Sequence, residues 1–424
     1  MKSDGEGRRD GFAAGPPQGK TRPLGGQRTS RSGERGGQQL VPFAALSASY
    51  FAHIGFFNPY LPLWLKDLGL PIFTIGLLTS MQSFTRLFAP YAWGAFSDHT
   101  GERVRLLRYC ALVALLVSLV LWWARSPAWL GVVLLLMFTH TSSMMSLTEA
   151  AMAHMVAGDW GRYGRVRLWG SAGFLLTVLV AGAWFDHFGM GHFPGWASAS
   201  LLLVLACTWW VPDTREDPQG HAAERPQIAP VLRIPAVRWF FAGQVCHIMA
   251  HFAVYGFLSL YLDSLGYGKM AIGALWAVSV VAEIAWFFVQ GRFVDRWPMP
   301  RWLLVCSAVM VLRMGMTWGL AGWWWALLLA QALHALTFAA HHTAGVATVS
   351  RYFPARLRGR GQALFTVAGY GVGGTTGVLL GSMLASRTGL QAVFAVAGGL
   401  ALLAWGCNLR MARAEREAAG PALV

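Results

Sequence analysis

Leu61-Pro-Leu-Trp-Leu-Lys-Asp-Leu-Gly69 recurs 197 positions later, without a gap, as Leu258-Ser-Leu-Tyr-Leu-Asp-Ser-Leu-Gly266. The same shift places Ile75-Gly76 on Ile272-Gly273 and Gly94-Ala-Phe-Ser-Asp98 on Gly291-Arg-Phe-Val-Asp295. Two apolar helices can share a composition by chance, but Gly and Asp at fixed positions throughout such a stretch indicate a repeat. The sequence therefore predicts a duplicated unit.

The composition is that of a membrane protein. Of 424 residues, 55% are hydrophobic and only 12% are charged, whereas soluble chains carry about 25% charged residues. Apolar runs of about 20 residues, the length with which a helix crosses a bilayer, recur along the chain. Residues 111–124 and 390–405 are almost continuously apolar, which excludes the alternating strands of an outer-membrane barrel.

The fold class expected from these runs is an all-α membrane protein with twelve transmembrane helices in two pseudo-symmetric six-helix halves. The polar N-terminal stretch, rich in Gly, Arg, Gln and Ser, cannot bury a core and is predicted to be disordered. The predicted parts are a cytoplasmic tail (1–38), a six-helix bundle (39–212), a cytoplasmic linker (213–233), a second six-helix bundle (234–411) and a C-terminal cytoplasmic tail (412–424).

The net charge of +15 is explained by topology rather than by a nucleic-acid partner. Arginines gather in alternate loops, as in 103–108, 215–225, 351–360 and 410–416. The positive-inside rule therefore predicts that both termini are cytoplasmic. The expected location is the inner membrane. The five cysteines stand singly in apolar segments and give no disulfide or metal pattern.

A loop motif carries the first family resemblance. Gly94-x-x-x-Asp98-x-x-Gly101-x-Arg103 resembles the signature loop of the major facilitator superfamily. Gly94 would permit close helix approach, and Asp98 could pair with Arg while an inner gate is shut. Gly291, Asp295 and Arg296 form a partial second copy without the later glycine. The resemblance implies that all six residues, Gly94, Asp98, Arg103, Gly291, Asp295 and Arg296, act in gating.

Ionisable residues inside the spans are few and are functional candidates by default. Arg86 in the second span and Glu283 in the eighth are related by the same 197-residue shift. Either they face each other across a central cavity as a charge-pair switch, or each pairs within its own half. The sequence leaves both alternatives open.

Two further groups resemble the lactose permease type of sugar/proton symporter. Glu149 and Arg167, with the Gly164-Arg-Val-Arg-Leu-Trp-Gly170 string, match residues that contact substrate there, although Arg167 could also be a positive-inside residue. Arg313 and His334 resemble that family's coupling helices. Those symporters have an acidic residue where this chain has Thr337. The proton would then sit on Glu283 or Glu149, with His334 as a further coupling residue, or coupling differs.

A closer resemblance is to the 3-phenylpropionate permease branch, which includes nucleoside/proton symporter-like proteins. It rests on strings spread over the chain, at Trp64–Leu70, Leu147–Ala150, Val166–Ser171, His251–Gly256 and Val281–Glu283. It implies proton-coupled symport of a small organic solute by alternating access, without a cofactor, in a monomer.

The charges expected around the cavity limit the chemical class of the solute. Three cations, Arg86, Arg167 and Arg313, stand against two carboxylates, Glu149 and Glu283. The excess positive charge together with aromatic walls favours a small aromatic carboxylate such as 3-phenylpropionate, in agreement with the permease resemblance. Arg86, Glu149, Arg167, Arg313 and His334 are the residues expected to bind it. A sugar or nucleoside symporter and a drug/proton efflux protein remain alternatives. No nucleophile, metal cluster or cofactor loop points to an enzyme.

Overall fold

The computed structural model describes residues 40–156, 160–213, 227–354 and 357–419. The predicted N-terminal tail and most of the predicted linker lie outside these ranges, as do the last five residues. Among the described residues the chain is helical. We call residues 40–213 the first half and residues 227–419 the second half.

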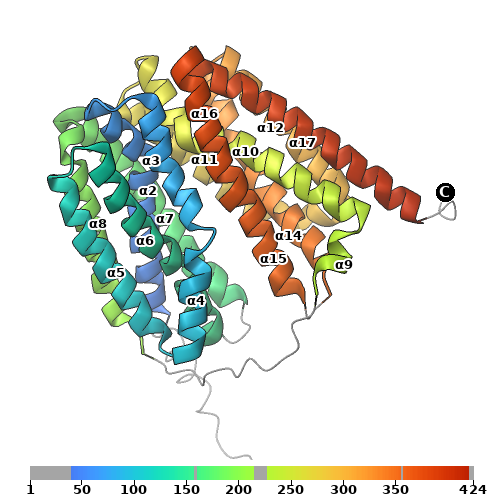
Figure 1. Ribbon diagram of the computed structural model, residues 1–424, viewed down its shortest axis with the longest axis horizontal. Helices are drawn as coiled ribbons and strands as arrows, with labels where there is room; N and C mark the ends of the chain where they lie inside the picture. The colour runs from blue at the N-terminus through green and yellow to red at the C-terminus, as the bar shows by residue number, and fades with distance from the viewer. Residues whose placement is uncertain (1–39, 157–159, 214–226, 355–356, 420–424) are drawn as a thin grey trace, which may run out of the picture. The chain divides into compact units, whose positions relative to one another are not determined.

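The first half begins with α2, and its helices run from blue to green in Figure 1. Its helices are α2 (Val41–Asp67), α3 (Ile72–Thr85), α4 (Ala89–Thr100), α5 (Arg103–Leu119), α6 (Pro127–Val156), α7 (Trp160–Phe188) and α8 (Phe193–Trp210).

The second half repeats this order with two interruptions, and runs from yellow-green to red in Figure 1. Its elements are α9 (Ala229–Leu232), α10 (Pro235–Ser264), α11 (Lys269–Val289), α12 (Met299–Gly319), α13 (Trp324–Ala332), the π-helical η5 (Ala335–Ala340), α14 (His341–Tyr352), α15 (Arg358–Thr366), the π-helical η7 (Val367–Gly373), α16 (Gly374–Thr388) and α17 (Leu390–Ala419).

Nine helical stretches in the described ranges are long and apolar enough to cross a membrane. The helix α2 and the interrupted stretches α3–α4 and α13–η5–α14 are not among them. The membrane class is therefore confirmed, and the number of twelve spans stays a prediction.

The second predicted span is divided at Arg86. Proline has no N–H, and its ring displaces the carbonyl four residues earlier, which for Pro90 is the carbonyl of Arg86. The backbone between the two helices makes tighter bonds instead, from Arg86 N to Ser83 O (3.2 Å) and from Phe88 N to Thr85 O (3.2 Å). The break places a charged side chain where the helix direction can change.

The halves meet through repeat-equivalent glycines. Gly76 in α3 lies against Ser382 of α16, and Gly273 in α11 lies against the Val178 carbonyl of α7, so closely that a Cβ atom at either glycine would collide. The two copies of the repeat thus share a glycine at this position for a packing reason, because only glycine permits both approaches.

The polar contacts between the described halves are concentrated at one end, which we call the Lys66 end. Lys66 Nζ lies 2.6 Å from Asp263 Oδ2, and these two residues are themselves repeat equivalents. Asp186 accepts hydrogen bonds from the backbone N–H groups of Lys269 (2.6 Å) and Met270 (2.8 Å). Toward the opposite end, which we call the Asp98 end, one polar contact crosses between described residues, from Tyr91 Oη to Ala363 O at 3.0 Å.

Candidate functional site

A fully buried arginine organises the interior of the second half. Arg313 in α12 is 0% exposed. Its guanidinium donates to Thr337 Oγ1 (3.0 Å) and Gln331 Oε1 (3.0 Å) and lies 3.2 Å from His334 Nδ1. In the described part of the chain these partners are neutral and no carboxylate touches Arg313. Three hydrogen bonds from one rigid fork therefore hold the cation inside the bundle.

These bonds determine how His334 is protonated. A guanidinium can only donate, so His334 Nδ1 must accept and the ring hydrogen of the neutral form is on Nε2. That nitrogen lies 3.4 Å from Glu283 Oε2. His334 is thus a bridge between a buried cation and a carboxylate from α11.

Glu283 is where this network reaches accessible space. Its side chain is 25% exposed, whereas that of His334 is 4% exposed. The chain of contacts Arg313–His334–Glu283 therefore begins in a sealed interior and ends at a carboxylate that is partly exposed.

Thr337 stands where the lactose permease type has an acidic residue, and its hydroxyl serves as a hydrogen-bond partner of Arg313. Its hydroxyl accepts from Arg313 and donates to Leu333 O at 3.1 Å. A neutral hydroxyl thus accepts from Arg313 where the lactose permease type has an acidic residue. Glu283 is then the acidic group nearest His334 among the described residues.

The first half holds a more open ion pair. Arg167 Nη1 lies 3.0 Å from Glu149 Oε1, with side chains 42% and 39% exposed. The guanidinium also lies 4.8 Å from the centre of the Phe51 ring. The structure therefore brings Glu149 and Arg167 together across α6 and α7, in the arrangement expected from antiparallel neighbours.

Arg86 and Glu283 do not pair in this conformation. Glu283 contacts His334 in its own half, and no hydrogen bond or ion pair links the Arg86 guanidinium to another described residue. Glu283 thus pairs within its own half, which is one of the two alternatives from the sequence. Arg86 pairs neither with Glu283 nor within its own half among the described residues.

The predicted gating residues lie at the Asp98 end. Arg103 Nη2 lies 3.2 Å from Asp98 Oδ1, and Gly101 ends α4 with a positive φ of 67°. In the partial copy, Arg296 stacks on Phe293 at 4.9 Å, beside Asp295 in a short 3-10 turn. The close helix approach expected at Gly94 is absent from the described residues, because a Cβ at Gly94 or Gly291 would meet no described atom within 4 Å.

Sequence reasoning missed several polar residues of the site. Gln331 binds both Arg313 and Ser279, and His342 Nδ1 lies 3.3 Å from Tyr370 Oη. A polar residue inside an apolar span was the available signal for each. The Lys66–Asp263 pair could have been found directly from the repeat alignment, since opposite charges occupy equivalent positions.

His247 and His251 of α10 have different neighbours. His247 Nε2 lies 2.8 Å from Thr337 O, and its ring stacks on His341 with centres 3.6 Å apart. His251 packs instead against His334 at 5.2 Å. Both imidazoles thus contribute to the packing around the Arg313 network.

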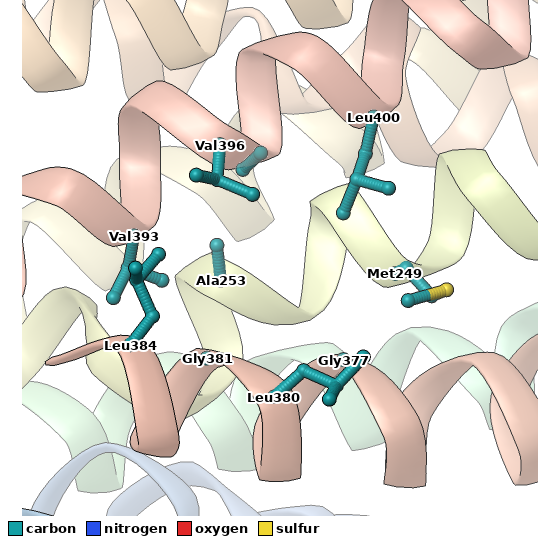
Figure 2. A pocket seen from close by; sticks show the side chains of 10 residues that line it. Met249, Ala253, Gly377, Leu380, Gly381, Leu384, Val393, Val396 and Leu400 are labelled. Carbon is teal, nitrogen blue, oxygen red and sulfur yellow. The ribbon is translucent and has the colours of Figure 1, made fainter.

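A cavity of about 260 Å³ lies elsewhere, between α10, α16 and α17. Figure 2 shows only carbon and sulfur side-chain atoms around it. None of the predicted site residues lines this cavity, whose walls are Met249, Ala253, Gly377, Leu380, Gly381, Leu384, Val393, Val396, Ala397 and Leu400. Such a lining offers nothing with which to orient a polar solute.

Comparison with known proteins agrees with the architecture. Residues 45–396 match the MFS_1 like family. A probable 3-phenylpropionic acid transporter of Escherichia coli (strain K12) is 30% identical over 319 residues, which cover 73% of this chain and 80% of that protein. The maltose permease of Geobacillus stearothermophilus is 25% identical over 329 residues, covering 76% and 81%.

Among solved structures, the nucleoside transporter NupG shares the fold, with a TM-score of 0.75 at 15% identity over 88% of this chain and 98% of that one. The predicted all-α membrane fold of the major facilitator type is thereby confirmed, apart from the number of spans. The relatives are transporters rather than enzymes. The helical repeat, the charged interior and the family match lead to one conclusion. The chain belongs to the MFS_1-like family and is a multi-pass transporter of the major facilitator type.

Proposed function

We propose that the chain is a proton-coupled symporter of a small aromatic carboxylate that works by alternating access. The observation that carries the proposal is the contact chain from the sealed Arg313 through His334 to the accessible Glu283. It provides one carboxylate that can take up a proton and a path by which its charge acts on a buried cation.

Glu283 is the proposed proton carrier, and His334 positions it. A second proton on His334 would place an N–H against the Arg313 guanidinium, and repulsion between the two cations opposes this. Protonation of Glu283 removes the negative charge that faces His334 Nε2. The conformation of the second half then depends on whether Glu283 is protonated, as a coupled transport cycle requires.

Arg86 is the proposed anchor for the solute's carboxylate. A cation inside the membrane is costly without a partner, and the described carboxylates nearby are occupied, Glu149 by Arg167 and Glu283 by His334. A bound carboxylate would supply the missing charge through a charge-assisted hydrogen bond. The name of the Escherichia coli relative supports this choice of solute.

The contacts between the halves support an inward-facing state, since the Asp98–Arg103 pair joins two residues of the first half and does not hold the halves together. Under the predicted orientation, with both termini cytoplasmic in the inner membrane, the Lys66 end faces outward. That end is closed by Lys66–Asp263 and by Asp186 on the start of α11. The two halves of one monomer would then rock about the central charges to open the other end.

Proton movement in liposomes tests the proposal. The purified chain is reconstituted with a trapped pH dye, and 3-phenylpropionate, maltose and a nucleoside are added in turn. Acidification with 3-phenylpropionate alone is the expected result. Acidification with maltose or the nucleoside would identify a sugar or nucleoside symporter instead. Alkalinisation of the lumen as the added solute enters would indicate proton/solute antiport, as expected of an exporter, and solute uptake without proton movement would reject coupling.

A further inference from the structure

The two π-helical segments of the second half bring a histidine and a tyrosine together. His342 is the second residue of α14, which continues from the end of η5, and Tyr370 lies within η7. Tyr370 Oη lies 3.3 Å from His342 Nδ1. Such π-helical segments occur frequently at functional sites, because the extra residue per turn redirects side chains.

His342 stands at the end of a column of rings that starts at the Glu283 network. The His334 and Phe338 ring centres are 5.0 Å apart and the rings are inclined by 10°. Phe338 and His342 follow with centres 6.3 Å apart and an inclination of 16°. The column therefore extends from the predicted coupling residue to the His342–Tyr370 pair.

The Arg86 helix break approaches the same pair from the first half. Leu87 packs on Gly371 so closely that a Cβ at Gly371 would collide, and Ser83 packs on Gly374 in the same way. Arg86 lies between these two contact residues in sequence, and Tyr370 directly precedes Gly371. A break in one half thus faces a π-helical segment in the other.

We propose that His342 and Tyr370 form the second half's part of the carboxylate subsite whose first-half part is Arg86. This proposal rests on the proposed function. With the Tyr370 hydroxyl donating to Nδ1, the ring hydrogen of neutral His342 is on Nε2, and no described residue bonds that nitrogen. Nε2–H can therefore donate to one carboxylate oxygen while Arg86 binds the other.

Such a carboxylate would join the two halves. Arg86 and His342 belong to different halves. Both can therefore contact one carboxylate only when the two halves bring them close together. The solute would then bind the joined state more tightly than the separated one, which is the difference that lets a ligand shift a conformational equilibrium.

Binding to the purified full-length chain tests the subsite. Calorimetric affinities for 3-phenylpropionate and its neutral amide are compared in wild type, His342→Asn, His342→Gln and Tyr370→Phe. Glutamine can place an N–H near the position of Nε2 and asparagine cannot. We expect His342→Asn to weaken carboxylate binding about tenfold or more and His342→Gln about threefold or less, with the amide little affected.

A double-mutant cycle with Arg86→Gln completes the test. If both residues hold one carboxylate, the combined loss is smaller than the product of the single losses. His140→Gln is the matched control, because that histidine bonds the Leu136 carbonyl of its own helix. Melting temperatures verify folding, and Tyr370→Phe gives an independent readout because it removes only the hydroxyl.

The outcomes separate the two proposals. Unchanged carboxylate binding in His342→Asn and Tyr370→Phe, equal losses for carboxylate and amide, or a fully additive cycle would overturn the subsite while leaving the symport proposal intact. Wild-type protein that binds no carboxylate at all would overturn the proposed solute, and the subsite with it.

Discussion

Positions 86 and 283 are equivalent in the repeat, yet their surroundings differ. Arg86 lies at a helix break, whereas Glu283 lies inside the continuous α11 and faces His334 at 3.4 Å. The first half's Glu149–Arg167 pair is about 40% exposed, and the second half's Arg313 is fully buried. Duplication supplied one framework, in which the first half holds a cation suited to anchor an anionic solute and the second half holds a carboxylate suited to carry a proton.

The largest expected effect is from Glu283→Gln. Glutamine keeps the size of the side chain but cannot exchange a proton, so accumulation driven by a pH gradient should fall about a hundredfold or more. Exchange of labelled for unlabelled solute across the membrane should persist, since it needs no net proton transfer. Uptake and counterflow in liposomes measure the two quantities.

Glu149→Gln is the matched control for that comparison, because it removes the carboxylate of the first half. If this variant loses accumulation and Glu283→Gln keeps it, the proton site has been assigned to the wrong half.

The next effect concerns the buried network. Arg313→Lys replaces a planar fork by a single ammonium, so Gln331 and Thr337 cannot both keep their short bonds. We expect the free energy of unfolding to fall by about 1–3 kcal/mol, measured as thermal unfolding in detergent. Arg125→Lys is the comparison, since Arg125 bonds backbone carbonyls at a helix end. Equal destabilisation by both changes would contradict a special role for the network.

A smaller effect is expected at the contact between the halves. Lys66→Ala removes an ion pair whose lysine is 48% exposed, so the closed Lys66 end should lose only about 0.2–1 kcal/mol. Spin labels at the exposed, repeat-equivalent Asp67 and Ser264 would report a larger fraction of long distances.

Exchange of the two charges, Lys66→Asp with Asp263→Lys, should restore closure only in part. The reason is Lys269, whose Nζ lies 3.0 Å from Asp263 and would repel a lysine there. Full restoration would mean that Lys269 contributes nothing to the closed state.

The smallest effect is predicted for Glu149→Gln on solute affinity. Its exposed pair with Arg167 contributes about 1 kcal/mol or less, so KM should rise no more than about fivefold. A loss as large as that of Arg86→Gln would place the carboxylate subsite at Arg167.

Much of the architecture could be predicted from the sequence because it depends on local patterns. Apolar runs predict helices, the 197-residue shift predicts the repeat, and the neighbouring α6 and α7 bring Glu149 to Arg167. Even the helix break had a local signal in Pro90. These features depend on residues close in the chain or on equivalent positions.

The partners of the interior charges could not be predicted in this way. Glu283 could face Arg86 across the halves or His334 within its own, and the choice depends on helix rotations that no periodicity determines. The contact between His342 and Tyr370 depends on two π-helical segments, and no residue type marks where such a segment forms.

Affinity for 3-phenylpropionate in Arg86→Gln and Glu283→Gln tests the division between the halves most directly. We predict that Arg86→Gln weakens binding about tenfold or more. Glu283→Gln, which mimics the protonated acid, should bind at least as tightly as wild type although it no longer accumulates solute. Equal loss of binding in both variants, or normal binding in Arg86→Gln, would contradict the assignment of the solute's anchoring cation to the first half and of the proton carrier to the second.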